Sequence, residues 1–390
     1  MFEDTNPSQS NFYTAQFILL STSSFLFFLS FNMMIPELPA FLAKLGGAEY
    51  KGLIISLFTL VAGASRPFSG KLADRIGRLP VMIFGVVVCI VCSSLYPILT
   101  SIYAFFLLRL VHGFSTGFTP TGTSAYIADI VPDTRRGEAI GMHSLMASVG
   151  NALAPVLGSG IANAYGLDAM FYASSALALI SALLFYNLKE TLTQKEQFRI
   201  QLLRISRADI LEPKVLPAFF VMVLIEVAYG TVLTIVPDQS QDLGIANKGL
   251  YLACMTTSSL AMRFLAGKAS DKYGRVIILK IAALLIMLAM IATGLAQNAT
   301  QLLLAGALYG IGLGMGMPTT FAWTIDLAHK VNTGRAVSTT FIALELGIGL
   351  GALISGWLEN IFGNYFVPLT FSGVMSGLAW LYLMLKNKEA

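Results

Sequence analysis

The chain has 390 residues, of which 56% are hydrophobic and 12% are charged, and its mean hydropathy is +0.72. Because soluble domains carry about 25% charged residues, this composition excludes a soluble protein and indicates an integral membrane protein. The net charge of +4 would point to anionic partners in a soluble protein, but in a membrane protein the distribution of charges matters more than their sum, and we expect no nucleic-acid partner.

Twelve apolar runs of about 20 residues are each long enough for a helix to cross ~30 Å of hydrocarbon. They cover residues 15–37, 50–69, 79–99, 102–126, 138–163, 167–188, 214–236, 248–267, 276–296, 299–323, 337–361 and 365–386. The sequence therefore predicts an all-α membrane protein, with an N-terminal six-helix bundle (1–188), a linker (189–213) and a C-terminal six-helix bundle (214–390). An interfacial amphipathic helix and a solvated segment are both compatible with the linker.

The lysine and arginine residues predict the orientation. Nineteen of them lie on one side of the predicted membrane, whereas only Lys44, Lys51 and Lys248 lie on the other. The positive-inside rule places both termini and the linker in the cytoplasm. All three cysteines fall within apolar runs, so we expect no external disulfide, no metal site and no cofactor.

The first run lacks the positive flank of a signal peptide and is predicted to be a retained helix. Ser24, Phe28 and Asn32 recur along it at helical spacing. We therefore expect this face to line a cavity, with Phe28 and Asn32 in contact with substrate.

The stretch that follows the second run is repeated. Arg66–Arg78 (RPFSGKLADRIGR) returns as Arg263–Arg275 (RFLAGKASDKYGR), 197 residues later, and the same offset relates Asp129 to Asp326. One structural unit therefore occurs twice in parallel order. Because the copies lie at the predicted cytoplasmic edge, we expect them to gate the site rather than bind substrate. Asp74 can accept backbone N–H groups at the start of the third helix. Lys71, Arg75 and Arg78 can pair with Asp74, with Asp129 or with lipid headgroups. The predicted gating residues are Gly70, Asp74, Arg75, Gly77, Arg78, Asp129, Gly267, Asp271, Gly274, Arg275 and Asp326.

Gly70–Arg78 (GKLADRIGR) resembles the signature loop between the second and third helices of the major facilitator superfamily, and Gly267–Arg275 resembles its weaker copy between the eighth and ninth helices. The resemblance covers nearly the whole chain. It implies a secondary transporter in which two six-helix bundles rock about a central site, with the signature loops closing the cytoplasmic side. It also implies a monomer.

The fourth run carries Arg109, His112 and Thr116 on nearly one face. A charged arginine within a span is costly unless it faces a cavity or a partner. Arg109 to Gly113 resembles the family's fourth-helix motif R-x-x-Q-G, whose arginine is associated with proton coupling, with His112 in place of the usual glutamine. We therefore place Arg109 and His112 in proton coupling and Thr116 in substrate binding.

The fifth run contains Gly141, Gly150, Ala154, Pro155 and Gly158, which resemble the antiporter signature of exporters in the superfamily, with alanine for its third glycine. Small residues and a proline allow a close, bent helix contact, which we expect to be with Gly347–Gly351 of the eleventh run. Asn151, next to Gly150, is a predicted substrate contact.

Two acids in the second half lie near mid-membrane and have no acidic counterpart in the first. Glu226 and Glu345 correspond to Leu29 and Ser148 at the 197-residue offset. Unpaired acids at this depth mark specific chemistry, so we predict that both take part in proton coupling. Glu226 and Tyr229 are also predicted substrate contacts, as are Tyr309 and Trp323 of the tenth run. The glycine-rich Gly310–Gly316 lies inside a span, which argues against a nucleotide loop.

These features predict a proton-coupled exporter of small amphipathic compounds or drugs, in the cytoplasmic membrane of a bacterium. A proton-driven uptake symporter, or an exporter of an anionic metabolite such as a siderophore or sugar, uses the same architecture. An enzyme or receptor would need a nucleophile or metal cluster or large extramembrane domains, none of which the sequence indicates.

Overall fold

The computed structural model describes residues 14–131, 135–204, 211–328 and 333–386. These residues form long helices and no strand. The N-terminal helices are α1 (Ala15–Met33), the short α2 (Leu38–Lys44), α3 (Gly52–Arg75), α4 (Arg78–Leu95), α5 (Ile102–Ile130), α6 (Arg136–Tyr165) and α7 (Leu167–Tyr186). The C-terminal helices are α8 (Leu216–Asp242), α9 (Leu250–Tyr273), α10 (Arg275–Leu295), α11 (Ala299–Leu327), α12 (Thr333–Phe362) and α13 (Phe366–Lys386).

Within the described residues, ten helical segments are long and apolar enough to cross a membrane, α1 and α2 counting together as one. The all-α membrane fold is thereby confirmed. α5 and α9 have the necessary length, 29 and 24 residues, but fall outside that set of ten. α5 carries Arg109 and His112, and α9 carries Arg263 and the charged repeat, so their polar residues lower the mean hydropathy.

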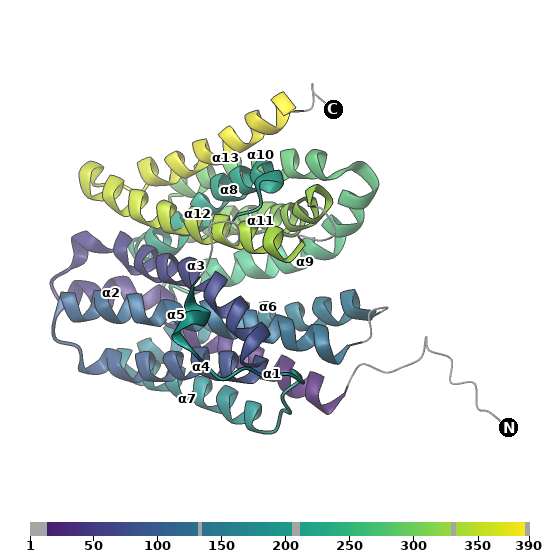
Figure 1. Ribbon diagram of the computed structural model, residues 1–390. Helices are drawn as coiled ribbons and strands as arrows, with labels where there is room; N and C mark the ends of the chain where they lie inside the picture. Colours follow the sequence, from purple (N-terminus) through teal and green to yellow (C-terminus); the bar gives the residue numbers. More distant parts are fainter. Residues whose placement is uncertain (1–13, 132–134, 205–210, 329–332, 387–390) are drawn as a thin grey trace.

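The helices form two stacked layers (Figure 1). α1–α7 make the lower layer and α8–α13 the upper one. In the first layer α3 and α4 pack on α5, and α6 and α7 pack on α1. The second layer repeats this arrangement, with α9 and α10 packed on α11 and α12 and α13 packed on α8. The parallel repeat seen in the sequence is therefore also a repeat of helix packing.

The turns that begin α4 and α10 explain two glycines of the repeat. Gly77 has φ 125° and Gly274 has φ 94°, values that residues with a side chain rarely adopt. Each glycine lets the chain reverse within a few residues between two adjacent helices. Gly77 and Gly274, which the sequence predicts to be gating residues, thus also form the turns before α4 and α10.

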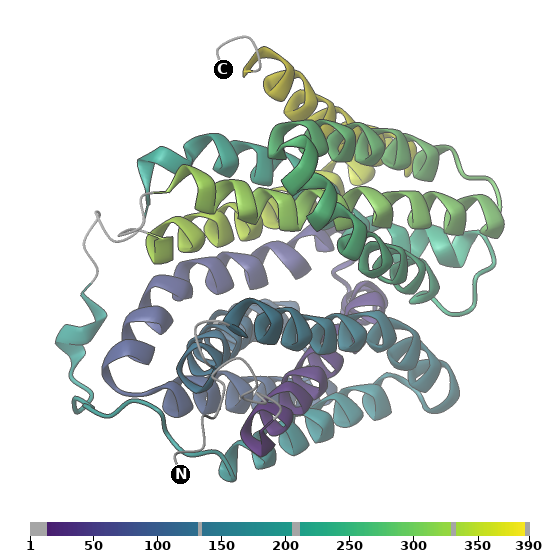
Figure 2. The same cartoon turned by 90° about the vertical axis from the view of Figure 1, so that its right-hand side faces the viewer.

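The long helices run between two ends of the molecule. The lysine end holds Lys51 and Lys248, which precede α3 and α9, and the linker end holds Arg78 and Arg275, which follow these helices. The described part of the linker lies at the linker end and is drawn in teal at the left edge of Figure 2. Apart from the 3₁₀ turns Ile200–Leu203 and Pro213–Val215, its described residues contain no helix. Residues 205–210 lie outside the described part of the chain, so both alternatives for the linker stay predictions.

The two layers meet through α3 against α12 and α6 against α9. The predicted contact between the fifth and eleventh runs, now α6 and α12, is wrong. The backbone of Met33 in α1 contacts Gly158 of α6, whereas Gly347 and Gly351 of α12 lie against α8. The repeat exchanges α3 with α9 and α6 with α12, so a contact between α3 and α12 implies one between α9 and α6. Symmetry-related helices would meet each other only on the axis itself.

The remaining residues of the antiporter-like motif also serve close packing. The backbone of Phe25 in α1 lies 2.6 Å from a Cβ built on Gly150, and Ala154 is fully buried. Pro155 meets the backbone of Gly249 at the start of α9. Only Gly141 has open space around it. The motif thus holds α6 close to α1 and to the second layer.

Candidate transport site between the two halves

A cavity of about 380 Å³ lies between the two layers and is lined by residues of both. It brings together seven of the predicted site residues: Phe28, Asn32, Arg109, Thr116, Asn151, Tyr229 and Glu345. The Asn32 amide donates to Asn151 Oδ1 at 2.5 Å and to the Phe28 carbonyl at 2.9 Å. Residues 119 positions apart in sequence therefore meet in a cavity that is lined by both aromatic and polar side chains.

Four predicted site residues do not line this cavity: Glu226, His112, Tyr309 and Trp323. Tyr309 is fully buried in α11. The Lys386 ammonium lies over the Trp323 ring, 5.4 Å from the ring centre. His112 is buried with Nδ1 3.3 Å from the Tyr96 hydroxyl. Helical spacing placed these residues on a polar or aromatic face, but that face packs against other helices.

Glu226 lies behind the cavity wall. It is 2% exposed, and its Oε1 has no hydrogen-bond partner among the described residues. Gly347 of α12 leaves room for its side chain, and the nearest influential charges are Glu345 and Arg263. Tyr229, one turn further along α8, lines the cavity. Glu226 is thus one helical turn from the cavity lining and within the electrostatic range of two charged groups that line it.

Arg109 forms a structural crosslink as well as part of the cavity wall. Its Nε donates to the Ile54 carbonyl of α3 at 2.8 Å, and its Nη1 lies 3.3 Å from the Tyr96 hydroxyl. The guanidinium also lies over the Phe58 ring, 4.5 Å from the centre. These contacts satisfy an arginine that the membrane would otherwise penalise.

Two arginines that the sequence analysis placed only in the repeat prove to face the cavity. Arg66 Nη2 lies 2.7 Å from Glu345 Oε1 across the interface between the halves. Arg263, its counterpart at the 197-residue offset, donates to Ser148 Oγ at 3.1 Å, again across the interface. Because Ser148 is the counterpart of Glu345, the two contacts are symmetry-related in position but differ in chemistry. The offset relates the two contacts to each other, but nothing in the sequence pairs Arg66 with Glu345.

The signature loops form matching charge clusters at the linker end. Arg78 contacts Asp74 at 2.6 Å and Asp129 at 3.1 Å. In the second half Arg275 contacts Asp271, and its Nε lies 2.9 Å from Asp326. Each cluster joins residues of a single half. Six of the predicted gating residues are therefore brought together in two equivalent groups of three. Arg75 pairs with the linker instead, and Gly70 and Gly267 have no neighbour at their Cβ positions.

The role predicted for Asp74 at the start of the third helix belongs to Glu190 instead. The Glu190 carboxylate accepts backbone N–H bonds from Arg78 and Leu79, at 3.0 and 3.1 Å, and from Thr191 and Leu192 of its own segment. A carboxylate at a helix N-terminus offsets the positive end of the helix dipole. The Asp74 carboxylate forms an ion pair with Arg78 instead.

The linker is attached to both halves. Arg75 Nη1 lies 2.5 Å from Glu196 Oε1, on the side of the first half. On the side of the second half, Arg335 of α12 donates to Glu212, and this hydrogen bond holds the pKa of the Glu212 carboxyl below its usual range. The described linker residues on either side of 205–210 are therefore each held to one half.

Ion pairs close the lysine end between the halves. Lys51 Nζ lies 2.7 Å from Asp238 and 2.5 Å from Glu359, both in the second half. Lys248, the counterpart of Lys51 at the same offset, lies 3.7 Å from Glu37 of the first half. Both lysines are less than 10% exposed. Removing a buried lysine from such a cluster leaves carboxylates without their counter-charge.

The sequence has a clear family match. The family model described as Major Facilitator Superfamily matches residues 20–245 and 218–390. The chain belongs to this superfamily. It is therefore a transporter by family, and the resemblance to this superfamily predicted from the sequence is confirmed.

Individual relatives are more distant. The chain is 28% identical over 376 residues to the multidrug resistance protein MdtG of Dickeya zeae (strain Ech586), covering 92% of each sequence. It is 22% identical to the staphylopine export protein of Staphylococcus aureus (strain Mu50 / ATCC 700699), covering 80% of this chain and 81% of that protein. The human organic anion transporter MFSD10 (TETRAN) has the same fold, with a TM-score of 0.72 at 17% identity, over 94% of this chain and 98% of the other.

Proposed function

We propose that this protein exports small amphipathic compounds in exchange for protons, by alternating access to the cavity between its halves. The observation that carries the proposal is the cavity itself, which both halves line with aromatic and polar side chains, with Glu345 in its wall and Glu226 one helical turn behind it. Similarity to MdtG and to the staphylopine export protein supports export rather than uptake. Protons are the coupling ion in this proposal, and the working unit is a monomer.

The exchange follows from competition for carboxyl groups. An ionised carboxylate buried without a partner is costly, so a site of this kind is stable when it holds either a proton or a cationic substrate. Glu226 is the proposed proton carrier, and Glu345 and Arg109 adjust its affinity, with His112 held as a buried hydrogen-bonding neighbour of Tyr96. Residues Phe28, Asn32, Asn151 and Tyr229 form the proposed binding surface.

The proposed orientation places the linker end in the cytoplasm and the lysine end outside, in the cytoplasmic membrane of a bacterium. In this orientation the Lys51 and Lys248 ion pairs, which join the halves at the lysine end, act as an external clamp. The signature loops, each held within its own half, act as a gate on the cytoplasmic side.

The gating proposal predicts that Asp74→Asn slows transport several-fold while the affinity for ligand stays within a few fold. Asparagine lacks the charge that pairs with Arg78, so the cluster is weakened far from the cavity. Transport in proteoliposomes and equilibrium binding in detergent provide the two measurements, with Asp271→Asn as the matched variant in the other half. A complete loss of binding by a folded Asp74→Asn protein would contradict gating.

The external clamp predicts that Lys51→Met opens the lysine end. Asp238 and Glu359 would then face each other without a cation and repel. The reporter is Thr116→Cys in the cavity, in a protein whose native cysteines are replaced by alanine. When Lys51→Met is added, this cysteine should react several-fold faster with a membrane-impermeant maleimide added to intact cells than it does when Lys51 is kept. Lys44→Met removes an exposed lysine at the same end and is the control. Equal labelling in both variants would argue against the clamp.

The export proposal is tested in proteoliposomes loaded with ethidium, a permanently cationic aromatic probe. An imposed gradient, with the medium on the lysine-end side more acidic than the other side, should drive ethidium toward the acidic side against its own concentration gradient. Counterflow without a pH gradient should persist. Accumulation of ethidium on the alkaline side would contradict exchange.

A second candidate function, export of an amphipathic anion, is favoured by one observation. Among the described residues, three arginines (Arg66, Arg109 and Arg263) line the cavity and one carboxylate, that of Glu345, does so. Arg263 is held by a hydroxyl and by Met317 Sδ at 3.9 Å, and its Nε has no partner among the described residues. An aromatic carboxylate should then compete with ethidium for binding. Arg263→Gln should weaken the binding of the carboxylate and leave the binding of ethidium unchanged.

A further inference from the structure

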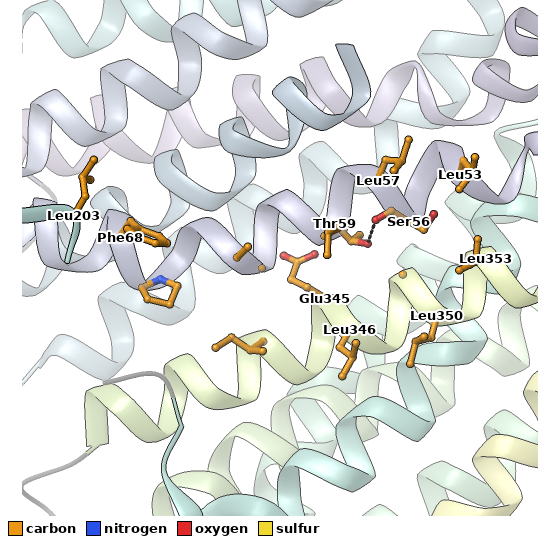
Figure 3. Close-up of a pocket in the computed structure, with 16 residues that line it drawn as sticks. Leu53, Ser56, Leu57, Thr59, Phe68, Leu203, Glu345, Leu346, Leu350 and Leu353 are labelled. Carbon is orange, nitrogen blue, oxygen red and sulfur yellow. Dashed lines mark hydrogen bonds between the residues drawn. The ribbon is translucent and has the colours of Figure 1, made fainter. Parts of the chain in front are cut away.

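A second hollow lies on the outer face of the molecule between α3 and α12. It encloses about 750 Å³ and is lined almost wholly by apolar side chains. Figure 3 shows Leu53 and Leu353 toward one end of this groove and Phe68 and Leu203 toward the other. Its wall residues Leu60 and Leu353 are 63% and 43% exposed, on a surface that the bilayer would cover. Exposed leucines are ordinary on such a surface; an acid among them is not.

That acid is Glu345. In Figure 3 its carboxyl group lies midway along the groove, between the two helices. Glu345 and Thr59 line both the groove and the central cavity, so a single layer of side chains separates the two spaces. Gly63 and Gly349 make this layer thin. A Cβ built on Gly63 would lie 3.1 Å from Glu345 Cβ, and a Cβ built on Gly349 would lie 2.7 Å from Thr59 Oγ1.

One oxygen of the Glu345 carboxylate, Oε2, can accept further hydrogen bonds. Arg66 donates to Oε1, and no hydrogen bond from a described residue reaches Oε2. Arg66 is itself loosely held, since its Nε is without a partner among the described residues and its guanidinium lies over the Phe341 ring at 4.4 Å. A cation arriving in the groove can therefore share or replace this contact while Arg66 stays over the ring.

We propose that the α3–α12 groove is a lateral binding site for lipophilic amines dissolved in the bilayer, with the ammonium on Glu345 and the apolar part along the leucine wall. The proposal rests on the export function given above and names its substrate class and its access route. The Arg66–Glu345 pair joins the two halves at the cavity, so an amine that competes for Glu345 also loosens the contact between them. Charge complementarity and continuity with the cavity favour an amine over a lipid acyl chain as the occupant.

The test compares two probes that differ in charge, 9-(methylaminomethyl)anthracene and 9-anthracenemethanol, by fluorescence anisotropy with the full chain in lipid nanodiscs. The amine should bind the wild type at least about tenfold more tightly than the alcohol. Glu345→Gln should remove that difference, and Leu60→Trp, which fills the groove, should weaken amine binding by a similar factor. Leu179→Trp places the same side chain on α7, at another exposed apolar position, and should change nothing.

Each outcome has a separate meaning. Equal binding of amine and alcohol that is insensitive to Glu345→Gln would show that the groove takes apolar chains of any kind, and would overturn the proposal. Amine binding unaffected by Leu60→Trp would place the amine elsewhere and overturn it too. The assay uses no proton gradient and leaves Glu226 unchanged, so a failure of the wild type to drive ethidium against its gradient would contradict export without touching the groove. Gel filtration of each variant checks that it is folded.

Discussion

Glu226→Gln is expected to abolish proton-driven ethidium efflux while the protein still folds and inserts. Glutamine keeps the size and hydrogen-bonding capacity of the side chain but cannot take up or release a proton. The buried position of Glu226, with Oε1 free of partners among the described residues, means that glutamine should be tolerated there. Efflux under an imposed pH gradient in proteoliposomes is the measurement, and counterflow without a gradient shows whether ethidium still binds.

Glu49→Gln provides the control, because Glu49 is exposed and precedes α3 at the lysine end. It should transport like the wild type. Unchanged proton-coupled efflux in Glu226→Gln would move the assignment to Glu345, or to Arg109 and His112.

Arg66→Met is expected to be the most destabilising single change in the cavity. It leaves the Glu345 carboxylate, 8% exposed, without the one ion-pair partner that it has among the described residues. Breaking a buried pair in this way costs about 3–5 kcal/mol, whereas replacing both partners with apolar residues costs far less. The double variant Arg66→Met/Glu345→Met should therefore recover most of the lost stability but not transport. Unfolding by denaturant in detergent gives the free energies.

The repeat supplies the matched control for this prediction. Arg263→Met removes the equivalent arginine, whose cross-interface partner is the Ser148 hydroxyl. Loss of such a hydrogen bond costs about 1–3 kcal/mol, so the destabilisation should be smaller. If both arginine variants lose the same free energy, or the double variant is no more stable than Arg66→Met, the ion pair is not what holds the halves together at this point.

The sequence was sufficient to predict the helices and the family because both depend on short-range patterns. Apolar runs fixed where helices form, and the Gly77 and Gly274 turns repeat at the offset that revealed the duplication. Helical spacing placed Asn32 and Arg109 on a face toward a cavity, and both line the cavity between the halves.

What was missed depends on how distant segments meet. Spacing shows that Tyr309 lies on a particular face of its helix, but not that this face packs against other helices. The Glu190 cap joins residues more than 110 positions apart, and nothing local to either segment signals it. The contact predicted between the fifth and eleventh runs failed for a related reason. A repeat relates equivalent helices without placing them on the symmetry axis.

Proton release on substrate binding tests the central claim most directly, because exchange requires proton and substrate to compete for one site. Purified protein in weakly buffered detergent solution is mixed with ethidium, which carries no titratable proton in this range, and a pH indicator records the change. Competition predicts about one proton released per ethidium bound in the wild type, and none in Glu226→Gln. Proton uptake on binding would contradict exchange and indicate that proton and substrate travel together.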